Sequence, residues 1–276
     1  MDFKTIICST ERGVGWITLH RPHRHNAWTG RMHTEYRQAL AEFEADQQVR
    51  VIVVTGHGRS FCVGGDAQAL QGHSDKGGYD PGTPDPLATP GFGVSADFDA
   101  AFAFHFGLTK PVIAAVNGAA AGVGLALMLF ADIRFAVPGA TFTTAHGKLN
   151  FPAEFGLSWL LPRMVGLTRA NDLLLTSRRF SSDEAYAWGM INALHEPDLL
   201  NPSVQAYAEQ LVADNAPEAL RVTKFQIYRD LHRDIASSVR FSEQQISRMS
   251  RTDDFKEGVA AFMEKRAPIW QGGSSD

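Results

Sequence analysis

One segment, residues 110–132, constrains the fold of this chain more than any other stretch (KPVIAAVNGAAAGVGLALMLFAD). It opens with a short apolar run at residues 111–116, bounded by proline and glycine, which predicts a buried strand. An Asn-Gly pair then indicates a turn, and two glycines flank Val123. Residues 125–131 are apolar on every side, which predicts two turns of buried helix. The segment therefore predicts a strand, a tight glycine-rich bend and the start of a helix.

Such a bend can leave backbone N–H groups free at a helix N-terminus, where they and the helix dipole favour negative charge. The negative charge could belong to a phosphate or to a transient oxyanion. A dinucleotide-binding fingerprint would need a glycine at position 127, which is Leu127, and the Gly-Lys-Ser/Thr of a phosphate loop is absent. Two interpretations remain open: an oxyanion hole, or glycines that only permit close packing of helix on sheet.

A second bend of the same kind lies earlier in the chain. The apolar run at residues 51–55 predicts another buried strand, and the segment 60–66 (SFCVGGD) follows it. Its two glycines allow the backbone to turn sharply and expose N–H groups. Asp66 is suited to cap a short helix over residues 67–70. The sequence thus offers two bends that could receive an anion.

Composition excludes several classes of protein. The 276 residues carry a formal net charge of −4 and no apolar run that could span a bilayer, so neither nucleic acid nor a membrane is expected as a partner. Two cysteines and no signal peptide predict a cytoplasmic protein. His20, His23 and His25 have no cysteine or carboxylate beside them, so we expect a solvated loop and no metal site there.

Other segments predict the surrounding elements. Thr29 is suited to cap a helix over residues 30–46, whose apolar side chains recur at helical spacing. Residues 71–97 are rich in glycine, proline and aspartate, which predicts a long loop, either a mobile wall of a site or a surface feature. Ser158 is expected to cap a helix over residues 159–165, and Ser182 is suited to cap the helix expected at 182–188. Further strands are expected at 14–19, 133–137 and 140–143, and further helices at 98–108, 169–176, 182–188, 202–214, 217–234, 237–249 and 253–265.

Five motifs taken together resemble one known family. They are His20-Arg-Pro22 with Asn26-Ala27, the segment 60–66, the segment 110–132, residues 160–166 (LLPRMVG) and residues 262–268 (FMEKRAP). In this order and spacing, the chain resembles the crotonase, or enoyl-CoA hydratase/isomerase, superfamily along almost its whole length. The resemblance implies an α/β fold with a right-handed spiral of β-β-α units over residues 1–200. It also implies a helical region, residues 201–276, that joins subunits into homotrimers or hexamers.

The resemblance further implies an acyl-CoA thioester as substrate, with coenzyme A part of the substrate and no separate cofactor. The thioester oxygen would rest between the backbone N–H groups of Gly65 and Val123, one in each bend. As an enolate forms, each such donor can lower the barrier by roughly 3–4 kcal/mol. Arg24, Ala27 and Lys265 occupy the positions that bind CoA in the family, although Arg24 and Lys265 could equally be solvated surface charges.

The chain departs from the family's hydratases at both of their catalytic glutamates, since Ala126 and His146 stand at those positions. Glu154 lies where one branch, the Δ3,Δ2-enoyl-CoA isomerases, carries a single carboxylate that moves a proton between C2 and C4. An apolar surrounding would raise the pKa of Glu154 toward neutrality and suit it as a base. His146 could serve as base instead. Each could also be structural, Glu154 at a helix start and His146 in a loop.

These residues lead us to expect an enzyme of fatty acid or acyl-CoA metabolism that isomerises enoyl-CoA esters or hydrates them in an atypical way. Two alternatives stay open: a hydrolase or C–C lyase of the same fold that uses His146, and an acyl-CoA binder without activity. Asp66 and Asp132 match the family pattern as structural residues that hold loops.

Overall fold

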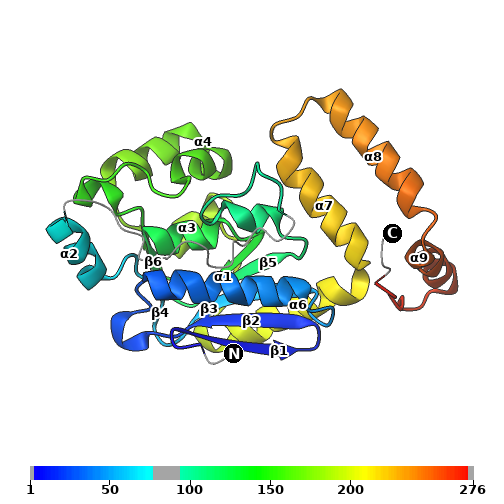
Figure 1. Cartoon of the computed structure of the whole chain (residues 1–276), viewed down its shortest axis with the longest axis horizontal. Coiled ribbons are helices and arrows are strands. Elements are labelled where there is room, and N and C mark those ends of the chain that lie inside the picture. The colour runs from blue at the N-terminus through cyan, green and yellow to red at the C-terminus, as the bar shows by residue number, and fades with distance from the viewer. Residues whose placement is uncertain (1–2, 77–93, 273–276) are drawn as a thin grey trace.

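A computed structural model describes residues 3–76 and 94–272 of the chain, in which two sheets pack against helices and β1 and β2 lie at one rim (Figure 1). In the larger sheet β1 is antiparallel to β2 and the other neighbours are parallel. Its strands, in spatial order, are β1 (Ile6–Glu11), β2 (Val14–Leu19), β3 (Val51–Gly56), β5 (Val112–Val116), β7 (Ile133–Ala136) and β10 (Ala193–Leu194). The smaller sheet has the order β4 (Ser60–Cys62), β6 (Ala119–Ala121), β8 (Thr141–Thr143) and β9 (Phe180–Ser181).

The chain crosses repeatedly from the larger sheet to the smaller one. β3 is followed by β4, β5 by β6 and β7 by β8, and helices follow these pairs along the chain. The helices are α1 (Gly30–Ala45), α2 (Ala67–Lys76), α3 (Val123–Leu129), α4 (Leu157–Thr176), α5 (Ser182–Ala187), α6 (Pro197–Asp214), α7 (Pro217–Asp230), α8 (Ile235–Met249) and α9 (Asp253–Glu264). Three 3-10 turns are η1 (Pro22–Arg24), η2 (Ala103–Gly107) and η3 (His146–Leu149). This repeated β-β-α order confirms the expected fold class.

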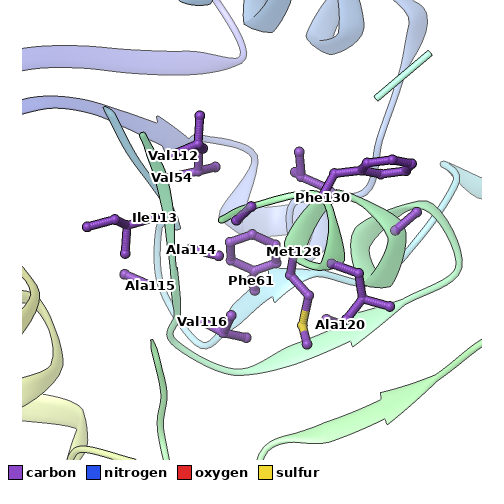
Figure 2. Packing of buried hydrophobic residues seen from close by; sticks show 14 of the residues in the cluster. Val54, Phe61, Val112, Ile113, Ala114, Ala115, Val116, Ala120, Met128 and Phe130 are labelled. Atoms are coloured by element: carbon purple, nitrogen blue, oxygen red, sulfur yellow. The ribbon is translucent and has the colours of Figure 1, made fainter. Parts of the chain in front are cut away.

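The centre of the core is the segment that the sequence singled out. All residues of β5 and α3 are buried. Figure 2 shows Phe61 and Met128 among the side chains that fill the space between β5 and α3. Position 124 has no room for a side chain, because a Cβ on Gly124 would lie 2.0 Å from the carbonyl oxygen of Cys62. The glycine therefore lets α3 approach β4 closely.

Two aspartates hold the loops around this core, as expected. Asp132 accepts hydrogen bonds from the backbone of Val112 (2.6 Å) and the hydroxyl of Tyr228 (2.6 Å), and its Oδ2 lies 2.8 Å from Lys224 Nζ. Asp66 Oδ2 lies 2.9 Å from Arg21 Nη2. Both carboxylates thus tie segments that are distant in sequence.

Several element boundaries differ from the expectations. Helix α2 runs to Lys76 instead of ending at residue 70, so residues 71–76 of the expected loop at 71–97 are helical, and residues 77–93 lie outside the described residues. The expected helix at 98–108 is wrong: only Ala103–Gly107 forms a 3-10 turn, because Phe102 has a φ of 62° that a helix cannot accommodate.

Two expected caps are also wrong by one or two positions. Gly156 and not Ser158 precedes α4, which continues through an irregular Gly166 (φ 77°) to Thr176. Ser181 caps α5, accepting from the Glu184 amide, and Ser182 is instead the first helical residue. The cap at Thr29 is confirmed, since its hydroxyl accepts from the Met32 amide. Hydroxyl residues mark helix starts well, but the exact cap depends on the local turn.

The C-terminal helices extend away from the two sheets. Figure 1 shows α8 and α9 beyond α7, with α9 at the far end from α2, whereas α7 itself contacts the body through Lys224 and Tyr228. Helix α6 crosses residue 200, so the two expected regions share a helix. Across the described ranges 3–76 and 94–272, no helix is long and apolar enough to cross a membrane.

Candidate active site

The two bends lie side by side at one edge of the smaller sheet. β4 pairs with β6 in parallel, with Ser60 opposite Ala119 and Cys62 opposite Ala120. Parallel neighbours end at the same edge, so the turns that follow them meet there. A Cβ on Gly64 would lie 3.2 Å from the carbonyl oxygen of Ala121, which places the two backbones in contact.

In the part of the chain that the structure describes, no hydrogen-bond partner is recorded for the backbone amide of either Gly65 or Val123. On one side, Trp28 donates to the Gly64 carbonyl (2.8 Å) and accepts from the Asp66 amide (2.9 Å), which leaves the Gly65 N–H between them unused. On the other side, Val123 is the first residue of α3, where N–H groups lack helical acceptors. Its side chain is buried, whereas Gly65 is exposed.

Glu154 faces the second bend. Its Oε2 lies 3.4 Å from the position that a Cβ on Gly122 would occupy. The half-buried carboxylate has no recorded hydrogen-bond or ion-pair partner among residues 3–76 and 94–272. Burial raises its pKa above the ordinary value for glutamate. An unpaired carboxylate with a raised pKa, beside a free backbone amide, has the properties of a general base.

Local backbone geometry explains why Glu154 faces the bend. Phe155 and Gly156 both have positive φ values (45° and 75°), so the chain turns sharply between Glu154 and the start of α4. The Leu157 amide donates to the Glu154 carbonyl (2.9 Å) and closes this turn. The Phe155 ring packs against Phe102, with ring centroids 5.2 Å apart. The residue that follows Glu154 is thereby anchored in an aromatic cluster.

His146, the other candidate base, is more deeply buried. It is the first residue of η3, its side chain is 6% exposed, and its Nδ1 is buried without a hydrogen-bond partner. Its backbone amide donates to the Thr144 carbonyl (2.7 Å), and Thr144 in turn is tied to α4 through the Leu173 carbonyl (3.1 Å). Among the contacts recorded for the described chain, none joins the His146 ring to Glu154 or to either bend.

The three expected CoA-binding residues are separated. Ala27 is buried, and its carbonyl accepts from Arg21 Nη1 (2.5 Å), which also holds Asp66 beside the first bend. Arg24 is exposed at the end of η1 on the same loop. Lys265 follows α9, which Figure 1 places far from α2 and α3. Within a single chain, Arg24 and Ala27 therefore lie near the bends, whereas Lys265 does not.

Comparison with known proteins identifies the family. A family model described as enoyl-CoA hydratase/isomerase matches residues 9–273. The chain belongs to the enoyl-CoA hydratase/isomerase family. It is 34% identical to the 1,2-epoxyphenylacetyl-CoA isomerase of Escherichia coli, covering 99% of both chains. It is 31% identical to the short-chain-enoyl-CoA hydratase of Clostridium acetobutylicum, covering 96% of this chain and 97% of the relative.

Solved structures agree with this assignment. The crystal structure of an enoyl-CoA hydratase/isomerase from Mycobacterium paratuberculosis superposes with a TM-score of 0.84 at 31% identity, covering 99% of this chain and all of the other. That of an enoyl-CoA hydratase from Bacillus anthracis gives 0.85 at 27% identity, covering 98% of this chain and 100% of the other. The protein is thus an acyl-CoA enzyme of the hydratase/isomerase family. Since these relatives are named for different reactions, family membership alone does not choose the reaction.

The structure also adds residues that the sequence did not single out for the site. The rings of Trp28, Phe102 and Phe155 form a row that runs from the residue beside Gly65 to the residue after Glu154, and His105, which is paired with Tyr36, bonds to the Phe102 carbonyl. Tyr36 is one of the apolar side chains that recur at helical spacing over residues 30–46, and nothing in the local sequence distinguishes it from the others. No group of three or more potential metal ligands occurs within residues 3–76 and 94–272.

Proposed function

We propose that this enzyme isomerises unsaturated acyl-CoA esters by moving a double bond between C3 and C2. The observation that carries the proposal is the position of Glu154, whose Oε2 lies against Gly122 in the bend that presents the Val123 amide. A base that can reach the α-carbon must lie within a few ångströms of the carbonyl oxygen site. Glu154 is the carboxylate that meets this requirement beside the bend.

The proposed mechanism uses one carboxylate twice. Ionised Glu154 removes a proton from C2 of a 3-enoyl thioester, and the electron pair passes into a dienolate. The developing charge on the thioester oxygen is stabilised by the N–H groups of Gly65 and Val123, which form the proposed oxyanion hole. Protonated Glu154 then returns the proton to C4, which leaves the double bond between C2 and C3 and restores the carboxylate.

Hydration is the less favoured reaction. The two-glutamate mechanism needs a second carboxylate, and Ala126 and His146 occupy those positions. Ala126 is fully buried within α3 and supplies no proton-transfer group. Hydration by this enzyme would therefore have to use Glu154 in an atypical way.

A second candidate function follows from one observation, the unpartnered and buried Nδ1 of His146. Buried polar atoms without partners are uncommon and often belong to catalytic groups. With His146 as base, the fold could support a hydrolase or a C–C lyase acting on acyl-CoA. A protein that binds acyl-CoA without turnover is the remaining alternative.

A panel of CoA esters tests these proposals. We would assay 2-enoyl-, 3-enoyl- and ring-bearing acyl-CoA esters, the last because a relative is named as a 1,2-epoxyphenylacetyl-CoA isomerase. Absorbance and product mass would be followed together. Isomerisation leaves the mass unchanged, hydration adds one water, and hydrolysis releases free CoA. Turnover of 3-enoyl-CoA with no change of mass supports the proposal, and any other product pattern contradicts it.

We also propose that the enzyme assembles through its C-terminal helices into a homotrimer or a hexamer, in the cytoplasm. Several large apolar side chains on α8 and α9 are exposed, which is unusual for a face that meets only water. They are Ile235, Val239, Ile246, Phe255, Val259, Phe262 and Met263. Assembly would offer Lys265 to the CoA site of a neighbouring copy, because its own site lies at the other end of the chain. The free Cys8 and Cys62 are consistent with a reducing compartment.

A further inference from the structure

Arg21 ties together the two segments that meet at Gly65. Trp28 and Gly65 form a parallel β-bridge, so the backbone of Trp28 lies beside the bend that presents the Gly65 amide. The Arg21 guanidinium contacts both sides of this bridge: Nη1 donates to the carbonyl of Ala27 (2.5 Å), and Nη2 donates to Oδ2 of Asp66 (2.9 Å). Ala27 directly precedes Trp28, and Asp66 directly follows Gly65. One side chain therefore joins the neighbours of both bridge residues.

The position of Arg21 is itself fixed by a buried asparagine. The Arg21 amide donates to Asn26 Oδ1 (2.9 Å), and the Arg21 carbonyl accepts from the Asn26 amide (3.0 Å). Asn26 is fully buried, and its Nδ2 donates to the carbonyls of His57 (2.9 Å) and Ser60 (2.7 Å). Ser60 is the first residue of β4, the strand that leads into the first bend. The guanidinium is thus attached to the same strand as the amide that it flanks.

Asp66 places a buried negative charge one residue from the Gly65 amide. Its side chain is 5% exposed. Burial alone would raise the pKa of Asp66, but the hydrogen bonds from Arg21 and from the Gln68 amide (2.9 Å) lower it below the ordinary value, so Asp66 is ionised at working pH. An uncompensated carboxylate here would repel the negative charge that develops on a thioester oxygen at Gly65. The cation at 2.9 Å offsets that repulsion.

We propose that Arg21 is a positioning residue of the oxyanion hole, which aims the Gly65 amide through the Trp28 bridge and offsets the charge of Asp66 beside the developing enolate. The proposal rests on the proposed function, because it requires a thioester oxygen at Gly65. Arg21 acts through the bridge and through Asp66, and it touches no reacting atom. The planar guanidinium can donate to a carbonyl and a carboxylate at once, which a lysine ammonium does with less geometric precision.

Three variants separate aiming from charge. Arg21→Met removes both hydrogen bonds and the cation, Arg21→Lys keeps the cation without the fork, and Arg21→Met/Asp66→Asn removes both charges together. With a 3-enoyl-CoA, we expect Arg21→Met to lower kcat about 10- to 100-fold with KM changed by less than about threefold. Arg21→Lys and the double variant should each lose less. The matched control is Arg12→Met, which removes an exposed ion pair with Glu209 (3.0 Å) and should equal the parent.

The decisive readout is the polarisation of a bound carbonyl, which a purely structural role of Arg21 would not change. We would measure the infrared carbonyl stretch of a saturated acyl-CoA labelled with carbon-13 at the thioester carbon. This ester has no double bond to move, so it stays intact while bound. Donors aimed at the carbonyl oxygen lower its stretching frequency. The frequency should fall on binding to the parent and to Arg12→Met, and most of that shift should be lost in Arg21→Met.

A full carbonyl shift in Arg21→Met would overturn the proposal even if kcat fell, because the loss of rate would then come from the fold. If Arg21→Met does not fold, the double variant decides, since it contains no unpaired buried charge at this place. It should lose part of the shift because the Gly65 amide is no longer aimed. A shift in the double variant equal to that of the parent would refute the role of Arg21.

Failure of the proposed function would look different. A parent enzyme that shifts the carbonyl of the saturated ester but turns over no 3-enoyl-CoA contradicts the isomerisation and leaves the role of Arg21 supported. A parent that binds the ester with no shift of the carbonyl contradicts the oxyanion hole, and the role of Arg21 fails with it.

Discussion

Replacing Glu154 by glutamine tests the proposed base with little disturbance of the fold. The carboxylate has no recorded partner in the described chain, so the amide breaks no recorded ion pair or hydrogen bond. The variant keeps the size of the side chain and removes its ability to accept a proton. General base catalysis contributes about 10²- to 10⁴-fold, so kcat should fall by that factor, or about 3–5 kcal/mol in activation free energy.

The assay follows conversion of a 3-enoyl-CoA to its 2-enoyl isomer by absorbance, with product mass measured in parallel. Binding of CoA esters, measured by calorimetry, should stay within about threefold of the parent, because the proposed oxyanion hole consists of backbone groups. The control is Glu196→Gln, an exposed glutamate at the start of α6. If Glu154→Gln retained turnover within threefold of the parent, Glu154 would not be the base, and His146→Gln would be the next variant to measure.

The pH dependence gives a second measure of the same residue. Burial raises the pKa of Glu154, so the acid limb of the rate profile should lie above the ordinary range for glutamate and vanish in Glu154→Gln. The folded state then binds this proton more tightly than the unfolded state. Its contribution to stability is therefore present below the ordinary glutamate pKa and is lost as pH rises through the folded pKa. At pH 7 the charged Glu154 is disfavoured in the folded state, so Glu154→Gln should melt at the same or a higher temperature than the parent. At low pH Glu154 is protonated, so the difference in melting temperature between variant and parent should shrink.

Three further substitutions test the packing, the buried ion pair and the proposed assembly. Gly124→Ala should lower the free energy of unfolding by about 1–3 kcal/mol or more in denaturant melts, because its Cβ would meet the Cys62 carbonyl at 2.0 Å. Lys224→Met should cost about 3–5 kcal/mol by the same measurement, because it leaves the buried charge of Asp132 without its cation at 2.8 Å. Phe262→Asp, at a position 82% exposed on α9, should reduce the mass seen by light scattering from three or six copies to a smaller species.

Each of these has a matched control. Gly72→Ala lies on α2 with nothing within 4 Å of the new Cβ, and it should be neutral or stabilising. Lys256→Met removes only an exposed ion pair with Asp253 and should change stability by less than about 1 kcal/mol. Leu175→Asp, exposed on α4, should leave the mass unchanged. Equal effects in variant and control would contradict the corresponding argument.

The sequence predicted the architecture well where short-range patterns are strong. Apolar runs located β3 and β5, and the Thr29 hydroxyl located the start of α1 within a residue. It failed at residues 98–108, where a helix was expected, since no local signal shows that the backbone adopts a positive φ at Phe102. The extent of α2 was missed because the composition of residues 71–97 is typical of a loop, and composition is a weak guide to where a helix ends.

By itself, the sequence determined that two glycine-rich bends follow buried strands and that Glu154, not the glutamates of the hydratases, is available as a carboxylate. Those properties depend on residue type and on neighbours within a few positions. Only the tertiary structure decided that the bends are adjacent, because that depends on the parallel pairing of β4 with β6. It also decided that Glu154 faces Gly122, 32 residues away (154 − 122), and that Tyr36 bonds to His105, 69 residues away (105 − 36). Long-range packing fixes such distances, and local sequence patterns do not encode them.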